Sequence, residues 1–364
     1  MNPGLTTSEP RLGAATSLTL SRSGRLPSLD GIRALSIALV LVAHLVETRN
    51  FLDHRLFWVL GDIGNLGVRV FFVISGFLIT NLLLKEHEAN GRISLKDFYV
   101  RRVLRIFPAF YLFVGCMVAA SALGLISLGE HDLVYAVTYT INHYNDRSWY
   151  MAHLWSLAVE EQFYLMWPCI LVILGRYAGL WVAAGMLIAA PITRTVIFYA
   201  LPSWRPGVGC IFPTVADALA TGCILAGARA WLGGRPWYVR FLSSRTLLAV
   251  PAFLFVTNAA CRVIPWFSLP IGQTILNIGI AICIDRWVTY PSGTVGGILN
   301  SRPFVFMGTL SYSIYLWQQP FLNHRSESLA CVFPINLVLV MAAALGSYYL
   351  VERPLLRLRS RFRR

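Results

Sequence analysis

The chain has 364 residues, of which 56% are hydrophobic and only 13% are charged, whereas a soluble domain carries about 25% charged residues. This composition excludes an ordinary soluble enzyme and indicates a polytopic membrane protein with one membrane domain. The net charge of +14 is compatible with nucleic-acid binding, but the charges fall in short clusters between apolar runs, which is the pattern of membrane topology. We therefore expect no nucleic-acid partner.

Runs of about 20 mostly apolar residues predict transmembrane helices. Ten such runs lie at 31–48, 66–84, 104–128, 153–174, 178–200, 211–231, 246–261, 266–284, 303–323 and 330–350. Basic residues concentrate before the first run, after the second and the sixth, and after Val351. The positive-inside rule then places both termini in the cytoplasm, which requires an even number of spans. The predicted fold is an all-α integral membrane protein of about ten transmembrane helices.

Three parts of the chain differ in composition. Residues 1–27 are rich in Ser, Thr, Gly and Arg and are predicted to be a disordered cytoplasmic lead. Residues 28–352 form the predicted membrane domain, and 353–364 form a basic cytoplasmic tail, which either sets topology or lies on anionic lipid. No small-residue cleavage site follows His44, so the first apolar run is interpreted as an uncleaved span.

Seven cysteines occur, none in a Cys-x-x-Cys pair and most within apolar runs. We expect them to be small buried hydrophobic side chains, and we predict no metal site.

The first span carries Arg33 and His44, eleven positions apart. Eleven helical residues make three turns plus about 20°, so the two side chains share a face about 16 Å apart along the axis. Arg33 is expected near the cytoplasmic surface, where it could simply anchor the helix. His44 is expected halfway across the membrane or beyond. Its imidazole could act as a general base, or it could form a hydrogen bond between helices.

A second polar cluster precedes the third span. Arg101, Arg102 and Arg105 lie within about one turn, and Arg102 and Arg105 share a face. These arginines either set the membrane topology as cytoplasmic positive charges or bind phosphate groups, which the planar guanidinium can contact through paired hydrogen bonds.

A third cluster interrupts the apolar run that begins at His153, with Glu160, Glu161 and Gln162 in succession. Glu160 and Tyr164 share a helix face, and His153 lies near the same azimuth. A buried carboxylate can orient a histidine or bind a substrate hydroxyl, while a purely structural network is the alternative.

Three other predicted spans contain polar or small residues that point less strongly to a function. Ser75 and Gly76 in the second span predict close helix packing. Asp217 opens the sixth span. The hydroxyl-rich stretch LSYSIYLWQQPF in the ninth either lines a sugar-sized cavity or hydrogen-bonds between helices.

Together these stretches resemble the membrane acyltransferase family 3, the bacterial O-acyltransferases that modify surface glycans, nodulation factors and some antibiotics. The matching pieces are LPSLDGIRALSIALVLVAH, GVRVFFVISGFLIT, FYVRRVLRIFPAFYL, LWSLAVEEQFYLMWP, LSYSIYLWQQPF and LVERP, in family order over nearly the whole chain. The resemblance implies a ten-helix protein of the bacterial inner (cytoplasmic) membrane. It also implies an acyl-CoA donor, commonly acetyl-CoA, and an acceptor hydroxyl on a glycan or glycolipid.

The residues and the resemblance together give an expected site. The expected catalytic residues are His44, Arg33 and Glu160, the expected CoA-binding residues are Arg101, Arg102 and Arg105, and the expected substrate-binding residues are Asp30, Gln162, Tyr164, Tyr315 and Trp317. His44 would either deprotonate the acceptor hydroxyl or carry the acyl group itself. A carboxylate such as Glu160 could set the imidazole tautomer.

Two positions depart from the family pattern. Gln318 stands where the family often has histidine, so this position is not expected to supply a base. Val215 stands where the family often has arginine, which puts an acceptor contact there in doubt. We expect the stand-alone form of the family, without the esterase-like domain that some relatives append.

Other functions remain open at this level. The acceptor could be a small hydrophobic metabolite such as a macrolide. A glycolipid transporter is a different class, and would release no CoA. A membrane scaffold is disfavoured, because it gains little from intramembrane histidine, arginine and glutamate.

Overall fold

The computed structural model describes residues 27–46, 48–52 and 62–359, and in these residues it contains helices and turns but no strand. The longer helices are α1 (Pro27–Leu45), α3 (Ile63–Asn90), α4 (Leu95–Ala122), α7 (Leu154–Ala200), α8 (Phe212–Gly233), α10 (Val250–Val263), α12 (Gln273–Thr289), α14 (Arg302–Phe321) and α15 (Ile335–Ser347). The shorter ones are α5 (Asp132–Val137), α6 (Trp149–Ala152), α9 (Pro236–Ser243), α11 (Pro265–Phe267), α13 (Gly293–Leu299) and α16 (Arg353–Arg359). The predicted all-α class is confirmed. The predicted lead, apart from Pro27, and the last five residues of the predicted tail (360–364) lie outside the described residues.

Eight stretches in the described part of the chain are long and apolar enough to cross a membrane. One of them, Trp149–Ala200, has 52 residues and covers two of the predicted spans. α14 covers the predicted ninth span but is not among the eight. The chain is therefore a multi-pass membrane protein, while the count of ten spans and the cytoplasmic termini stay predictions.

Large apolar side chains lie both inside and outside this bundle. The largest fully buried ones include Trp167, Phe72, Phe77, Phe110 and Phe113. Ile173 and Trp181 are 77% and 78% exposed on the surface of the bundle. Many further exposed apolar side chains surround them, a surface suited to hydrocarbon rather than water.

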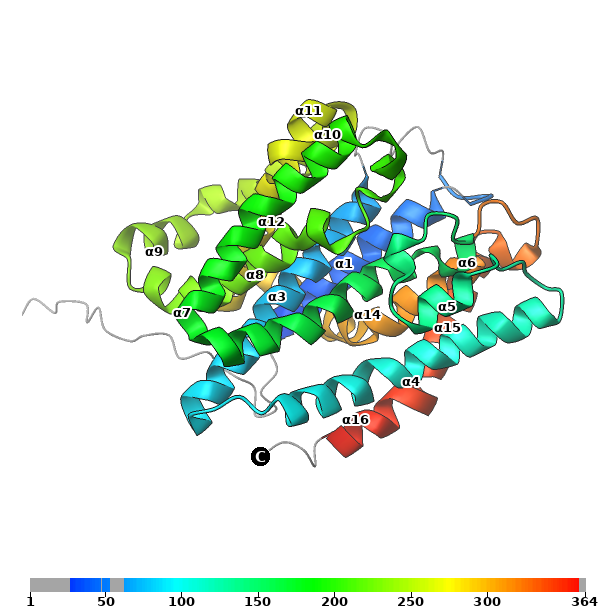
Figure 1. Ribbon diagram of the computed structural model, residues 1–364, viewed down its shortest axis with the longest axis horizontal. Helices are drawn as coiled ribbons and strands as arrows, with labels where there is room; N and C mark the ends of the chain where they lie inside the picture. Colours follow the sequence, from blue (N-terminus) through cyan, green and yellow to red (C-terminus); the bar gives the residue numbers. More distant parts are fainter. Residues whose placement is uncertain (1–26, 47, 53–61, 360–364) are drawn as a thin grey trace, which may run out of the picture.

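Gly175 divides α7 into two arms, 154–174 and 176–200. Its φ of 76° lies in the left-handed region, which glycine adopts without steric cost. The arms fold back on each other, since a Cβ on Gly179 would lie only 2.6 Å from the Leu171 side chain. Figure 1 shows the sharp bend between them. These arms correspond to the predicted spans 153–174 and 178–200.

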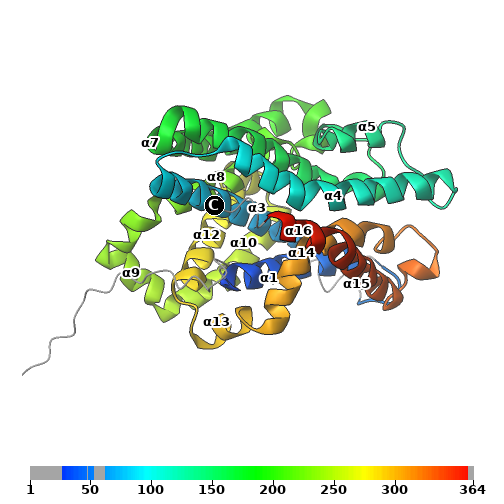
Figure 2. The same cartoon turned by 90° about the horizontal axis from the view of Figure 1, so that it is seen from below.

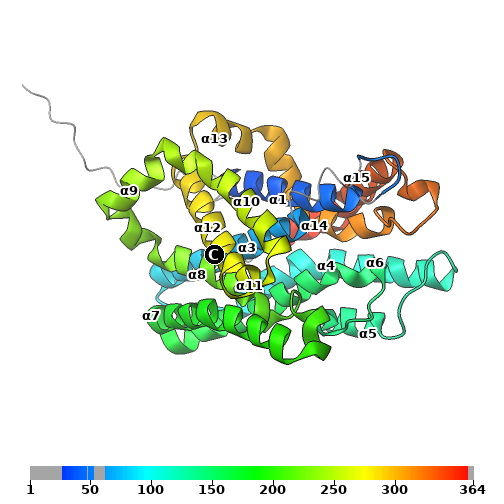
Figure 3. The same cartoon turned by 90° about the horizontal axis from the view of Figure 1, so that it is seen from above.

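α3 packs against both α8 and α1, and α1 also packs against α14 (Figures 2 and 3). Glycines permit the crossing of α3 and α8. A Cβ on Gly76 would lie 2.0 Å from the carbonyl oxygen of Leu219, and one on Gly222 would lie 2.1 Å from that of Val73. The predicted packing role of Gly76 is confirmed: the two backbones are in direct contact.

α4 begins nine residues before the predicted span 104–128. Ser94 caps the helix, because its Oγ accepts a 3.3 Å hydrogen bond from the Asp97 amide. Arg101, Arg102 and Arg105, which were predicted to lie at the start of the third span, are therefore part of the helix itself. Hydropathy detects only the apolar part of α4, whereas arginine is a good helix former and its aliphatic stem packs on apolar neighbours.

Candidate active site

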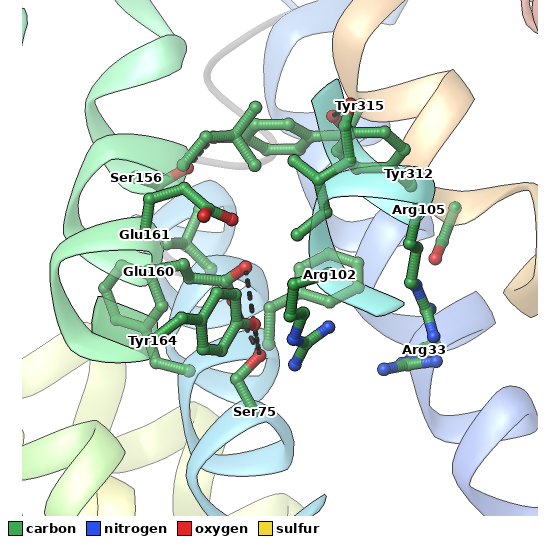
Figure 4. Close-up of a pocket in the computed structure, with 16 residues that line it drawn as sticks. Arg33, Ser75, Arg102, Arg105, Ser156, Glu160, Glu161, Tyr164, Tyr312 and Tyr315 are labelled. Carbon is green, nitrogen blue, oxygen red and sulfur yellow. Dashed lines mark hydrogen bonds between the residues drawn. The ribbon is translucent and has the colours of Figure 1, made fainter. Parts of the chain in front are cut away.

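A cavity of about 80 Å³ is enclosed by α1, α3, α4, α7 and α14 (Figure 4). Its apolar walls come from Val68, Phe71, Phe72, Ile106 and Leu157. Its polar lining consists of Arg33, Ser75, Arg102, Arg105, Ser156, Glu160, Glu161, Tyr164, Ser311, Tyr312 and Tyr315. A cavity of this composition, with ionisable groups from four helices, is the default candidate for an active site in a membrane bundle.

The cavity brings together about half of the residues singled out from the sequence. Those that line it are Arg33, Arg102, Arg105, Glu160, Tyr164 and Tyr315. Those that do not are Asp30, His44, Arg101, Gln162 and Trp317. The chemical roles expected for these residues stay predictions.

Glu160 is held at both of its carboxyl oxygens. Ser75 Oγ donates to Oε1 at 2.7 Å, and the Tyr164 hydroxyl lies 3.1 Å from Oε2. The same Tyr164 hydroxyl lies 3.0 Å from Ser75 Oγ, so the three side chains form a closed triangle (Figure 4). These contacts hold the carboxyl group at one place on the cavity wall.

Cations outnumber carboxylates in the cavity. Arg102 places its guanidinium carbon 3.9 Å from the ring centroid of Tyr164, a cation–π contact. Arg33 is held by Asp30, with 3.7 Å between guanidinium and carboxylate. Figure 4 shows Arg102, Arg33 and Arg105 on the side of the cavity opposite Glu160. With three arginines against two glutamates in its lining, the cavity favours an anionic ligand.

Arg101 lies on α4 and contacts the C-terminal part of α3. Its guanidinium forms a 3.0 Å ion pair with Glu86, whose other oxygen accepts a 2.8 Å hydrogen bond from the Ser94 amide. Arg101 also borders a smaller cavity of about 30 Å³, which Arg102 and Arg105 line as well. Its neighbours are the apolar side chains Leu78, Ile79, Leu82 and Phe98.

His44 lies in the last turn of α1, at the opposite end of the helix from Arg33. Its ring meets that of Trp149 edge-on, with 5.8 Å between centroids. Tyr315 links this region to the cavity. Its hydroxyl lies 2.5 Å from Ser156 Oγ and donates to the His153 carbonyl at 3.0 Å.

Gln162 and Trp317 contact neighbouring segments of the chain rather than the cavity. The Gln162 amide nitrogen donates to the Tyr139 carbonyl and to the Asn142 side chain, both at 3.0 Å. Trp317 packs edge-on against Phe113 of α4, with 5.5 Å between centroids. Neither Gln162 nor Trp317 lines the cavity, whereas Glu160 and Tyr315, each two positions earlier in the chain, do.

The two departures from the family pattern have distinct surroundings. Gln318 is fully buried. Asp217, which lacks an arginine two residues before it, receives one from another helix: Arg194 of the second arm of α7 donates to its Oδ2 at 2.7 Å. Thr274 of α12 donates to the same oxygen at 2.7 Å.

Sequence reasoning missed Ser156 and assigned Ser75 to packing. Ser156, Glu160 and Tyr164 recur every four residues, so they share one helix face, and this spacing was the available signal for Ser156. No pattern could reveal the partner of Ser75, because Glu160 lies on a different helix. In the described part of the chain, no group of three or more His, Cys, Asp and Glu side chains could hold a metal ion.

Comparisons with known proteins agree on one family. The family model described as "Acyltransferase domain" matches residues 26–350. "Peptidoglycan O-acetyltransferase OatA" of Listeria monocytogenes is 28% identical over 332 residues, which cover 85% of this chain and 51% of the relative. "Putative peptidoglycan O-acetyltransferase YrhL" of Bacillus subtilis is 29% identical over 373 residues, covering 91% and 55%. The chain thus spans about half the length of the curated relatives it matches. No solved structure matches it.

Proposed function

Because this chain belongs to the acyltransferase-domain family, we propose that it transfers an acetyl group from acetyl-CoA to a hydroxyl of a cell-surface glycan. The observation that carries the proposal is the cavity in which three arginines face the Ser75–Glu160–Tyr164 triangle. The names of the relatives favour peptidoglycan as the glycan.

The donor end of the proposed site is the arginine side of the cavity. Arg102 and Arg105 line both the main cavity and the smaller one, so they can hold phosphate groups at the junction of the two. Arg33 adds a third guanidinium from α1. CoA carries several phosphates, and guanidinium groups bind phosphate with paired, charge-assisted hydrogen bonds.

The glutamate side of the cavity is where the acyl thioester would lie. A carboxyl group fixed by Ser75 and Tyr164 can accept a proton or hold a substrate group without rearranging. Tyr315 and Ser156 stand between this wall and the region of His44. The acyl group, still joined to CoA through its thioester, would extend past this tyrosine–serine pair to reach an acceptor beside His44.

In the transfer step, the acceptor oxygen attacks the thioester carbonyl carbon, the carbon–sulfur bond breaks, and CoA leaves as a thiolate. His44 would take the proton of the acceptor hydroxyl as a general base. In a second version His44 itself attacks the thioester and later passes the acyl group to the acceptor. Both versions yield one ester and one CoA thiol per turnover.

The full chain, purified and reconstituted in liposomes, tests the proposal. With acetyl-CoA and soluble peptidoglycan fragments, we expect CoA thiol release and a mass gain of one acetyl group on the fragments. The Glu160→Gln variant serves as the inactive control. Thiol release without esterified product would indicate a thioesterase, and the absence of both would contradict acetyl transfer to peptidoglycan.

A further inference from the structure

The position of α9 (Pro236–Ser243) between two candidate membrane spans predicts that it lies at the membrane boundary. It occupies the connection between α8, which ends at Gly233, and the stretch Arg245–Val263, and both of these are long and apolar enough to cross a membrane. It packs against the ends of α8 and α12 (Figure 2). The distribution of basic residues predicts that this boundary faces the cytoplasm.

The inner face of α9 is fixed to the bundle. Tyr238 and Leu242, one turn apart, are buried together with Leu247. The Tyr238 hydroxyl donates a 2.6 Å hydrogen bond to Asp285 of α12, whose other oxygen accepts a 2.7 Å hydrogen bond from Arg229 of α8. Buried apolar contacts and a charge-assisted pair therefore hold the helix in one orientation.

The outer face of α9 combines exposed aromatic rings with arginines. Trp237 and Phe241, also one turn apart, are 60% and 40% exposed. Trp231, at the end of α8, is 57% exposed, and the Arg235 guanidinium lies 4.6 Å from the centroid of its ring.

Charge on this surface is of one sign. Arg240 and Arg245 are exposed beside the aromatic rings. The sequence contains no aspartate or glutamate between positions 229 and 250. In the described residues, Arg235, Arg240 and Arg245 form no ion pair with a carboxylate. We call the set Trp231, Arg235, Trp237, Arg240, Phe241 and Arg245 the α9 surface.

We propose that the α9 surface binds the headgroups of anionic phospholipids. Tryptophan and phenylalanine on an interfacial helix enter the boundary between headgroups and acyl chains. Arginines beside them then lie at the depth of the lipid phosphates, and a lipid with net negative charge satisfies them best. The occupant is the surrounding bilayer, because the surface lies where α8 and α10 meet the membrane plane.

The other end of the bundle supports this assignment. It too exposes tryptophans, Trp204 at 57% and Trp266 at 71%. The arginine nearest to Trp204 in sequence, Arg205, turns its guanidinium to the carbonyl of Phe198 at 2.6 Å. Tryptophan is thus exposed at both ends of the bundle, and the α9 surface combines it with three exposed arginines that form no ion pair within the described residues.

The test measures whether the full chain, reconstituted in phosphatidylcholine vesicles, prefers an anionic lipid to a zwitterionic one. Tryptophan quenching is measured with brominated phosphatidylglycerol and, separately, with brominated phosphatidylcholine. We expect stronger quenching by the anionic lipid at low salt and loss of this preference at 1 M salt, because headgroup attraction is screened within about 3 Å there. Inorganic phosphate at millimolar concentration should not compete, since the site is proposed to bind lipid.

Two double variants locate the effect. Arg240→Gln/Arg245→Gln should lower the preference for the anionic lipid by at least about fivefold. Arg92→Gln/Lys96→Gln removes two exposed cations from the α3–α4 turn, which carries no exposed aromatic ring, and should leave the preference unchanged. Equal quenching by both lipids in the wild type, an equal loss in both double variants, or displacement by free phosphate would overturn the proposal. If a variant fails to fold, the quenching of the wild-type protein at low salt and at 1 M salt still tests the proposal.

Discussion

Ser75 and Glu160 lie 85 positions apart in the chain, yet the serine hydroxyl donates a 2.7 Å hydrogen bond to Oε1 of the glutamate. The serine comes from α3 and the glutamate from the first arm of α7. Tyr164, one turn further along that arm, holds the other carboxyl oxygen. The carboxyl group is therefore oriented before any substrate binds, which is what a catalytic or anchoring group requires.

Removing this carboxyl group should abolish most of the activity. Glu160→Gln keeps the size of the side chain but cannot accept a proton, so we expect kcat for acetyl transfer to fall by about 100-fold or more. Ser75→Ala should lower kcat by about tenfold, because one of the two hydrogen bonds that orient the carboxyl group is lost while Tyr164 still holds it. Ser75→Thr, which keeps the hydroxyl, should recover most of the rate. Wild-type kcat in Ser75→Ala would show that the bond is dispensable.

Arg102 and Arg101 adjoin in sequence but should differ in function. Arg102→Lys loses the planar fork and the contact with Tyr164, so KM for acetyl-CoA should rise by about tenfold. Arg101→Lys preserves the charge opposite Glu86 and should leave KM unchanged. Steady-state kinetics over a range of acetyl-CoA concentrations measures both values. Equal increases for the two variants would contradict the assignment of Arg101 to the ion pair with Glu86.

His44 is expected to act chemically and His153 structurally. His44→Ala should lower kcat by about 100-fold or more in protein that retains its thermal stability. His153 is buried and its Nε2 lies 3.1 Å from the Leu316 carbonyl, so His153→Ala should lower the melting temperature instead. If folded His44→Ala protein transfers acetyl groups at the normal rate, the proposed mechanism is wrong.

Gly76 and Gly115 form a matched pair for packing. A Cβ on Gly76 would lie 2.0 Å from a backbone oxygen of α8, whereas one on Gly115 would meet nothing within 4 Å. Gly76→Ala should therefore destabilise the protein by about 1–3 kcal/mol or prevent folding. Gly115→Ala should stabilise α4 by up to about 1 kcal/mol, because alanine is the better helix former. Thermal melts in one detergent compare them, and similar melting temperatures would contradict the close crossing of α3 and α8.

The buried pair of Arg194 and Asp217 should be sensitive to the loss of either partner. Their side chains are 1% and 0% exposed, and they lie 2.7 Å apart. Arg194→Met leaves a buried carboxylate uncompensated, which costs about 3–5 kcal/mol. The double variant Arg194→Met/Asp217→Leu should regain much of this stability. Chemical denaturation of the wild type, Arg194→Met, Asp217→Leu and the double variant gives the coupling energy, and additive losses would rule out a direct interaction.

The longer helices of this protein could be predicted without the structure, because a helix in lipid must satisfy its own backbone and present a long apolar run. The break at Gly175 agreed with the gap between two predicted spans. The family resemblance, carried by ordered sequence blocks, was also confirmed. The start of α4 was predicted too late, because hydropathy does not detect the helical turns that carry arginine.

Within one helix, the candidate site could be predicted as well. Glu160 and Tyr164 share a face at i and i+4, and both line the cavity. The partners of these side chains on other helices could not be predicted. Ser75 reaches Glu160, and Arg194 supplies the charge opposite Asp217, from helices far away in sequence. Such contacts depend on the distance between two helices and on the rotation of each helix about its axis. Close backbone crossings, such as the one at Gly76, determine this distance and rotation. Hydrophobic periodicity does not encode them.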